Sequence, residues 1–456
     1  MKLSVIGTGY VGLVSGVCLA HVGHDVRCVD IDESKVDRIN AGECPIHEDG
    51  LPELLAGVLG QRFSATTDLT SAVHDSHMTL IAVGTPFGEE RIDLAQIEAA
   101  ARSVGEALAT KDGYHVVAVK STVVPGTTET VVLPILAEAS GKTPGVDFGV
   151  GMNPEFLREG VAVPDFLHPD RIVVGGIDDR ARDVMADLYA PFETTDLIKT
   201  TPSTAEMIKY TANSLLATLI SFSNEVANLS AAVGVDVVDV LDGVHLDHRF
   251  APLLAEQADA GDRIRPGMLT YLYPGCGFGG SCFPKDVKAL AAHAAAAGVD
   301  VPVLRGALEV NEHQPAKLVD LVADAVPAPA KVAVLGAAFK PGTDDVRESP
   351  TLRIVPDLVA RGYDVALHDP IALPNARAEL GDGLRYEVDL DSALSDAAAV
   401  LLVTSWPDYD GLAKHLDDHP NDGEMPVIID GRRFLDPDDF AEYRGIGFPP
   451  RGRVGR

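Results

Sequence analysis

The sequence predicts an α/β protein with two doubly wound parallel sheets, joined by a long central helix and a helical middle domain. Three observations support this prediction. Short apolar runs alternate with helical patterns before Ser203, helical periodicity alone follows, and the alternation returns after Ala330. Such alternation is typical of parallel sheets that carry helices on both faces. We therefore expect three domains, at residues 1–202, 203–325 and 326–456.

The expected strands are short apolar segments. They are Lys2–Ile6, Asp25–Asp30, Met78–Val83, His115–Val119 and Arg171–Gly175 in the first domain, and Lys331–Gly336, Tyr363–His368, Ala399–Thr404 and Val427–Asp430 in the last.

The middle of the chain is expected to be helical. Ser203 and Glu206 have the spacing of a capping box, and apolar residues at helical spacing continue to about Val233, where Gly234 is a stop signal. At ~1.5 Å per residue this helix would be about 45 Å long, enough to link two domains and to form a dimer surface. Two further helices are expected at Pro284–Ala297 and Val303–Val322.

Composition excludes several classes of function. The formal net charge of −31 repels nucleic acid and anionic membranes. No apolar run approaches the ~20 residues of a membrane span, and the first run is too short for a signal peptide, so we expect a cytoplasmic protein. The 5 cysteines have neither a disulfide framework nor zinc-site spacing, so we expect no metal.

A glycine-rich turn predicts the cofactor site. Gly7, Gly9 and Gly12 form a GxGxxG motif that follows a strand and opens a helix, which suits the pyrophosphate of a dinucleotide. Asp30 ends the second strand, where its carboxylate would accept hydrogen bonds from the adenine ribose and repel a 2′-phosphate. The motif therefore favours NAD over NADP.

A second glycine-rich loop predicts a nucleophile. Four glycines between Gly275 and Gly280 precede Cys282, and Pro284 suits the first turn of the following helix. A helix N-terminus and the neighbouring Lys285 both lower the pKa of a thiol. Asp286 lies four residues further on and could accept a proton. We expect Cys282 to be reactive, and Cys18, Cys28 and Cys276 to be inert core residues.

Together these motifs resemble the UDP-glucose/GDP-mannose dehydrogenase family over essentially the whole chain. The resemblance rests on an ordered set: Gly7–Leu13, residues 83–86, 121–123, 125–128 and 153–160, residues 206–210 with Asn213, the Cys282 loop, residues 338–341 with 343–345, and residues 430–432.

The resemblance implies an N-terminal NAD-binding Rossmann domain, a dimerising central helix, and a C-terminal Rossmann-like domain that binds the UDP-sugar. It also implies that a sugar C6 alcohol is oxidised twice, through a thiohemiacetal and a thioester on Cys282. Lys209 and Asn213, which share a helix face, would stabilise oxyanions. Asp286 and Glu155 would assist thioester hydrolysis, and Thr122 would position water or cofactor.

The remaining site residues follow from the same resemblance. The implied cofactor-binding residues are Gly7, Gly9, Tyr10, Val11, Gly12, Asp30, Lys35, Thr85, Thr122, Glu159 and Lys285. The implied substrate-binding residues are Glu155, Phe156, Leu157, Arg158, Glu159, Lys209, Asn213, Tyr271, Leu272, Tyr273, Gly275, Gly279, Lys340 and Arg432.

Several alternatives stay open at this stage. Relative to the family pattern the chain has an insertion within residues 251–269, so Arg249, Arg263 or Arg265 could be the arginine that reaches a neighbouring subunit. Residues 156–160 and 271–275 look more like the UDP-glucose branch, with GDP-mannose and UDP-N-acetylhexosamine enzymes as alternatives. An NAD-binding regulatory protein without turnover, and a hydroxyacid dehydrogenase that yields one NADH, are hypotheses from other classes.

Overall fold

The computed structural model describes residues 1–88, 90–252, 264–418 and 425–449. The chain separates into two compact units, residues 1–212 and residues 213–456. Each unit is described below by itself, and the three-domain division expected from the sequence stays a prediction.

Unit 1 is built on an eight-stranded sheet with the order β3-β2-β1-β4-β5-β6-β7-β8. The first six strands are parallel and have the order of a Rossmann fold. Strand β7 runs antiparallel to β6, and β8 runs parallel to β7. The strands are β1 Lys2–Ile6, β2 Asp25–Val29, β3 Phe63–Thr66, β4 Met78–Ile81, β5 His115–Val119, β6 Phe148–Met152, β7 Arg171–Gly176 and β8 Asp196–Thr200.

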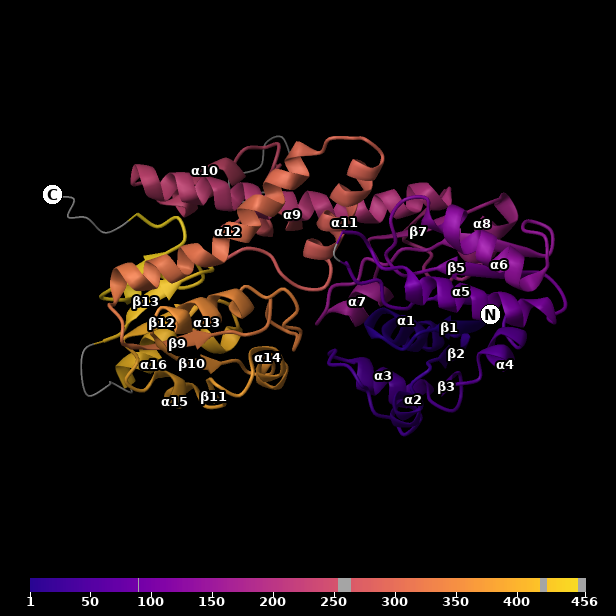
Figure 1. Ribbon diagram of the computed structural model, residues 1–456, viewed down its shortest axis with the longest axis horizontal. Helices are drawn as coiled ribbons and strands as arrows, with labels where there is room; N and C mark the ends of the chain where they lie inside the picture. The colour runs from indigo at the N-terminus through magenta and orange to yellow at the C-terminus, as the bar shows by residue number, and fades with distance from the viewer. Residues whose placement is uncertain (89, 253–263, 419–424, 450–456) are drawn as a thin grey trace. The chain divides into compact units, whose positions relative to one another are not determined.

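Helices cover both faces of this sheet (Figure 1). Strand β5 shows the arrangement, because Val116 and Ala118 pack into one core cluster while Val117 and Val119 pack into another on the opposite face. Burial on both faces explains why the strands read as continuous apolar runs. The helices of unit 1 are α1 Tyr10–His21, α2 Glu33–Asn40, α3 Leu51–Val58, α4 Leu69–His74, α5 Ala95–Ala109, the π-helical turn Thr128–Val132, α6 Leu133–Ser140, α7 Ala162–Leu167 and α8 Asp179–Asp187.

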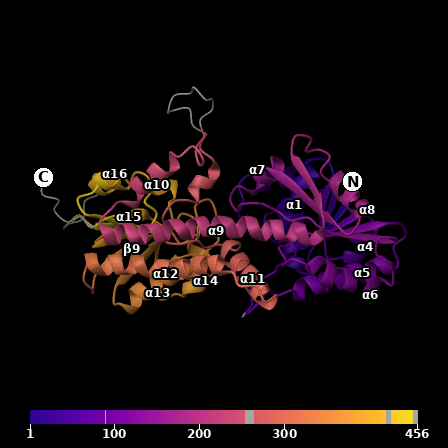
Figure 2. The ribbon, with the colours of Figure 1, turned by 90° about the horizontal axis from the view of Figure 1, so that it is seen from above.

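The central helix α9 extends over Pro202–Val233 as one continuous helix (Figure 2). Its end was predicted correctly, since Gly234 adopts a positive φ of 76° directly after it. The capping box was wrong. The hydroxyl of Thr201 accepts a hydrogen bond from the Thr204 amide, whereas the Glu206 carboxylate accepts hydrogen bonds from backbone amides of Gly126 and Thr128. Ser203 lies inside the helix and bonds Glu129.

Unit 2 contains a six-stranded parallel sheet with the order β11-β10-β9-β12-β13-β14, which is again a Rossmann order. The strands are β9 Lys331–Leu335, β10 Asp364–His368, β11 Arg385–Glu387, β12 Ala399–Leu402, β13 Val427–Asp430 and β14 Tyr443–Gly445. The helices are α10 Val237–His245, α11 Phe283–Ala296, α12 Pro302–Ala325, α13 Thr351–Ala360, α14 Leu373–Leu380, α15 Leu390–Leu394 and α16 Leu412–Asp418, with short 3₁₀ turns at Gly267–Thr270, Pro407–Tyr409 and Pro437–Asp439. The expected fold class, including every strand named above, is confirmed.

Candidate active site

The first glycine loop has the geometry that a dinucleotide needs. It joins β1 to α1, whose N-terminal residue Gly9 is extended and lacks a side-chain cap. The amides of the first turn of α1 are therefore free of side-chain competition for an anion. A Cβ on Gly12 would stand 2.0 Å from the Gly7 carbonyl oxygen, whereas a Cβ on Gly9 would meet no atom within 4 Å. Gly12 thus serves close packing, and Gly9 leaves space where a pyrophosphate fits.

Asp30 follows β2 at the same edge of the sheet. Its carboxylate accepts hydrogen bonds from the Thr8 amide at 2.9 Å and from the Asp32 amide at 3.0 Å. Burial alone would raise the pKa of Asp30, but these bonds and the nearby Lys35 hold it below its ordinary value. A half-buried, ionised carboxylate at this position suits ribose hydroxyls and disfavours a 2′-phosphate.

Thr85 and Thr122 are brought together by the loops after β4 and β5. The Thr85 hydroxyl donates a hydrogen bond to the Thr122 carbonyl oxygen at 2.8 Å. Since the carboxyl ends of β1, β4 and β5 lie at one edge, these loops and the glycine loop line the edge where α/β folds bind ligands.

Glu155 and Lys209 form a buried ion pair. The Glu155 Oε1 atom lies 2.9 Å from the Lys209 Nζ atom, and the two side chains are only 6% and 4% exposed. Burial raises the pKa of Glu155, but Lys209, the Leu157 amide and Lys120 more than offset that effect, so the pKa is lower than usual. Glu155 is therefore a carboxylate at neutral pH.

The segment after Glu155 is held by carboxylates. The Arg158 guanidinium makes a two-pronged contact with Asp165, at 2.9 and 2.6 Å, and this pair is partly exposed. The Arg171 guanidinium lies over the Phe156 ring, and its central carbon is 3.8 Å from the ring centre. A buried glutamate that we did not single out from the sequence, Glu48, accepts hydrogen bonds from the Gly160 and Ala162 amides.

In unit 2 the second glycine loop ends at the predicted nucleophile. Cys282 is the N-terminal cap residue of α11 and is partly exposed, with its Sγ atom 3.5 Å from the Ser281 hydroxyl. Gly280 has a positive φ of 83°, and a Cβ there would stand 2.7 Å from the Phe339 ring. The expectation that Cys282 starts a helix is confirmed.

Asp286 lies one turn into α11 and is completely buried. Its carboxylate accepts a hydrogen bond from the Asn213 amide group at 2.6 Å and pairs with the Lys285 Nζ atom at 2.6 Å. Lys285 is thus engaged by Asp286 rather than standing free for a cofactor. A buried carboxylate held by two donors, four residues from the thiol, is a suitable acceptor for protons.

Polar side chains from other elements hold the glycine loop, and no sequence signal pointed to them. The Gly275 amide donates to Asn224, and the Gly275 carbonyl oxygen accepts from Gln314. Asn311 bonds both the amide and the carbonyl of Phe278. Before the loop, Leu272 is buried, burial raises the pKa of Tyr273, and the rings of Tyr271 and Phe283 are in contact.

The two predicted cations of unit 2 lie in loops at the carboxyl edge of its sheet. Lys340 follows β9 and Arg432 follows β13. The Arg432 guanidinium donates hydrogen bonds to the carbonyl oxygens of Val403 and Gly277, and a Cβ on Gly275 would stand 3.2 Å from it. Arg432 therefore lies against the glycine loop that carries Cys282.

Asp369 stands in the second sheet where Asp30 stands in the first, but its surroundings differ. It follows β10 as Asp30 follows β2, but it is only 2% exposed. Its oxygens accept from the amides of Ala337 and Ala338, from the Trp406 indole, and from two amides of the next turn. No lone pair is left to bind a ribose.

The other cysteines fit the expected inert role. Burial raises the pKa of the Cys18 thiol to about 12 and also raises those of Cys28 and Cys276. None of the five cysteines, all of which lie in the described residues, forms a disulfide. Within the described residues there is no cluster of histidine, cysteine and carboxylate side chains that could hold a metal, and none of the described helices is both long and apolar enough to cross a bilayer.

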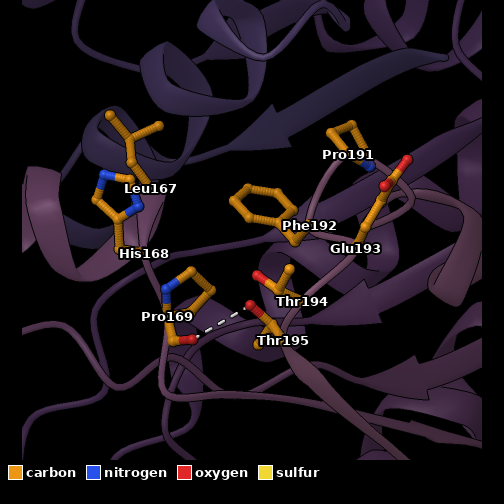
Figure 3. Close-up of a pocket in the computed structure, with 8 residues that line it drawn as sticks. All are labelled: Leu167, His168, Pro169, Pro191, Phe192, Glu193, Thr194 and Thr195. Atoms are coloured by element: carbon orange, nitrogen blue, oxygen red, sulfur yellow. Dashed lines mark hydrogen bonds between the residues drawn. The ribbon is translucent and has the colours of Figure 1, made fainter.

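One hollow in unit 1 has a volume of about 520 Å³, and none of its lining residues is a predicted site residue (Figure 3). It is lined by the segments that precede β7 and β8, where the Thr195 hydroxyl donates to the Pro169 carbonyl oxygen at 3.3 Å. Among the candidate arginines, Arg249 pairs with Asp247 at 2.6 Å and Arg265 is exposed, while Arg263 falls outside the described residues.

Known proteins share this arrangement. Residues 1–193 match the NAD binding domain of the UDP-glucose/GDP-mannose dehydrogenase family, residues 203–313 its central domain and residues 333–437 its UDP binding domain. A UDP-glucose 6-dehydrogenase of Haloferax volcanii is 42% identical over 98% of this chain and 100% of its own length. A GDP-mannose 6-dehydrogenase of Pseudomonas aeruginosa is 41% identical over 81% of each chain.

Solved structures agree with these matches. The structure of a UDP-glucose dehydrogenase from Pyrobaculum islandicum superimposes with a TM-score of 0.87 at 40% identity, covering 98% of this chain and 97% of that one. The chain therefore belongs to the UDP-glucose/GDP-mannose dehydrogenase family and is an NAD-dependent oxidoreductase that acts on a CH–OH group.

Proposed function

We propose that this enzyme oxidises the C6 alcohol of UDP-glucose to the carboxylate of UDP-glucuronate, with Cys282 as covalent nucleophile. The observation that carries the proposal is the start of α11. There a partly exposed thiol caps a helix, and a buried carboxylate, Asp286, lies four residues on, held by Asn213 and Lys285. This arrangement is what a covalent oxidation of an aldehyde requires.

NAD⁺ supplies the hydride acceptor for both oxidations, held by the glycine loop and Asp30. The alcohol first becomes an aldehyde, with loss of a hydride and a proton. The Cys282 thiolate then adds to the aldehyde carbon and forms a thiohemiacetal. Loss of a second hydride and proton gives the thioester, and water cleaves its C–S bond to release the acid and restore the thiol. The sum consumes two NAD⁺ and one water.

The ionised state of Glu155 supports a role as proton acceptor during these steps. With Asp286 it would assist the attacking water, while Thr122 positions water or cofactor. Lys209 and Asn213 are one turn apart on α9, so they share a helix face, and both side chains are buried. We propose that they stabilise the oxyanions of the thiohemiacetal and of thioester hydrolysis, as cationic and amide donors do at such centres.

The named relatives support UDP-glucose as the substrate. The UDP-glucose 6-dehydrogenase noted above is 42% identical over 98% of this chain, whereas a GDP-mannose 6-dehydrogenase that covers the same share of the chain is 38% identical. We propose that Lys340 and Arg432 bind the sugar nucleotide, together with Tyr271, Leu272, Tyr273, Gly275 and Gly279. Arg158 would contact substrate only after leaving Asp165. GDP-mannose is the second candidate, and the location in the cytoplasm stays a prediction.

A homodimer is proposed from the surface of α9. Its exposed apolar side chains recur at spacings of seven or eight residues and then four, which places them on one stripe. They are Met207, Leu215, Phe222, Leu229 and Val233, which are 43% to 64% exposed. An exposed apolar stripe on a long helix is typical of a helix-to-helix contact, and a second copy of the chain carries the same stripe.

The test is to count NADH. Purified protein with limiting UDP-glucose and excess NAD⁺ should yield two NADH per sugar, and Cys282→Ser should lose the full reaction. Cys276→Ser is the matched control, because that thiol is buried in the core and should be dispensable. One NADH per sugar would exclude the thioester route. Turnover with GDP-mannose or a UDP-N-acetylhexosamine alone would correct the substrate, and no turnover with any of them would favour a regulatory NAD-binding protein.

A further inference from the structure

A buried glutamate connects the cofactor loop to the segment that follows Glu155. Glu48 lies between α2 and α3 and is only 3% exposed. Its Oε1 atom accepts a hydrogen bond from the Ala162 amide at 2.7 Å, and its Oε2 atom accepts one from the Gly160 amide at 2.7 Å. The Tyr10 hydroxyl also donates to Oε2. The three donors come from two segments, because Tyr10 lies 150 residues before Gly160 in the chain, whereas Gly160 and Ala162 are close neighbours.

The partners of Glu48 belong to two proposed binding elements. Tyr10 is the first residue of α1, directly after Gly9, so its backbone amide is among those that we propose for a pyrophosphate. Gly160 and Ala162 connect residues 155–159, which we propose to contact substrate, to helix α7. The Gly160 amide also lies 3.2 Å from the Tyr10 hydroxyl, so hydroxyl, amide and carboxylate form a closed triangle.

The Tyr10 phenol keeps the proton that it donates to Glu48. Burial and the adjacent Glu48 raise the pKa of the Tyr10 phenol, so it stays a donor throughout the neutral range. If Glu48 lost one of its three donors, its buried side chain would be left partly unsatisfied. The state with all three hydrogen bonds therefore differs in free energy from a state that lacks one of them.

We propose that Glu48 is a positioning residue that couples the two ligands: dinucleotide bound at the α1 N-terminus holds Tyr10 in place, and Tyr10 and Glu48 together hold residues 155–160 in the form that binds sugar nucleotide. The inference rests on the proposed function. Linkage requires that such coupling be reciprocal, so each ligand should increase affinity for the other. A ligand has this effect only when it binds one state better than the other.

The test measures coupling rather than activity. UDP-glucose is titrated calorimetrically into the full-length protein with and without saturating NADH, which cannot accept a hydride and so permits no turnover. We expect NADH to tighten UDP-glucose binding by about fivefold or more in the unmodified protein, at the lower end of common allosteric couplings. The measured ratio is the affinity for UDP-glucose with NADH divided by the affinity without it. In Tyr10→Phe, and in Glu48→Gln, this ratio should fall below about twofold.

Tyr114→Phe is the matched control. Within the described part of the chain the Tyr114 hydroxyl is buried without a hydrogen-bond partner, so its loss should leave the ratio unchanged. If Glu48→Gln does not fold, Tyr10→Phe carries the test, because it keeps the ring and leaves Glu48 two backbone donors.

The outcomes separate the two proposals. An unmodified ratio near one, or a ratio that Tyr10→Phe leaves intact, would overturn the coupling while UDP-glucose binding itself upholds the proposed function. A protein that binds NADH but no UDP-glucose would overturn the proposed substrate, and the coupling with it.

Discussion

The buried Lys209–Glu155 pair allows a prediction in which size, sign and pH dependence all follow from the structure. In Lys209→Met the Glu155 carboxylate loses its cation while it stays buried. Breaking a buried ion pair by removing one partner costs about 3–5 kcal/mol. Because the Leu157 amide still donates to Glu155 at 2.6 Å, we expect the lower end, about 3 kcal/mol. In a unit of 212 residues, each kcal/mol lowers Tm by about 2–4 °C, so a loss of roughly 6–12 °C follows.

The pH dependence has a definite sign. In the unmodified protein the pKa of Glu155 is lowered, so its contribution to stability is present above the unfolded-state pKa and is lost as pH falls through the folded one. In Lys209→Met, burial should instead raise that pKa, and protonation then favours the folded state. The two proteins should therefore differ most at pH 8 and least in mild acid.

Thermal melts at several pH values provide the assay. Lys199→Met removes an exposed lysine that pairs with Asp183, and it should cost less than about 1 kcal/mol. The double variant Lys209→Met/Glu155→Met should recover much of the lost stability, because it removes the buried charge. A loss no larger than that of Lys199→Met, or a difference in Tm that does not change with pH, would refute the reasoning.

Three more predictions follow. Gly12→Ala should lower Tm, because its Cβ would stand 2.0 Å from the Gly7 carbonyl oxygen. Gly9→Ala should leave Tm unchanged and weaken NADH binding, since its Cβ enters open space. Thermal melts measure the first effect and fluorescence titration of NADH the second, and equal effects of the two variants would contradict the geometry. Asp286→Asn should slow turnover by about 10²–10⁴-fold and let a thioester accumulate on Cys282 that mass spectrometry detects; unchanged turnover would exclude Asp286 as proton acceptor. Phe222→Glu should dissociate the proposed dimer in light scattering, and a persistent dimer would place the interface elsewhere.

Local patterns predicted much of the fold. Strands β5 and β13 were predicted to the residue, because an apolar run buried on both faces is visible in the sequence itself. The start of α11 at Phe283 was within one residue of the prediction, since Pro284 marks a first helical turn. The stop at Gly234 was equally local. Signals of this kind act over a few residues and depend little on the rest of the chain.

The ion pairs and anchors were not predictable in the same way. Glu206 had the spacing of a capping box, yet its carboxylate binds the amides of Gly126 and Thr128, which the fold brings to it from 80 and 78 residues away. The Thr128 hydroxyl donates to the same carboxylate at 2.6 Å, and these three donors together outcompete one local partner. The sequence likewise does not say that Arg158 faces Asp165 or that Lys285 faces Asp286.

The sequence by itself determined which residues we propose for the chemistry: the glycine loop with Asp30, the thiol of Cys282, and the polar face of the central helix at Lys209 and Asn213. Residue type, helical spacing and glycine pattern are properties of short segments, so they can be read directly. Only the tertiary structure decided that Lys209 pairs with Glu155, that Asn213 holds Asp286, and that Glu48 joins two loops. The physical reason is that hydrogen bonds and ion pairs act over about 3 Å, and the packing of strands and helices decides which distant segments come that close.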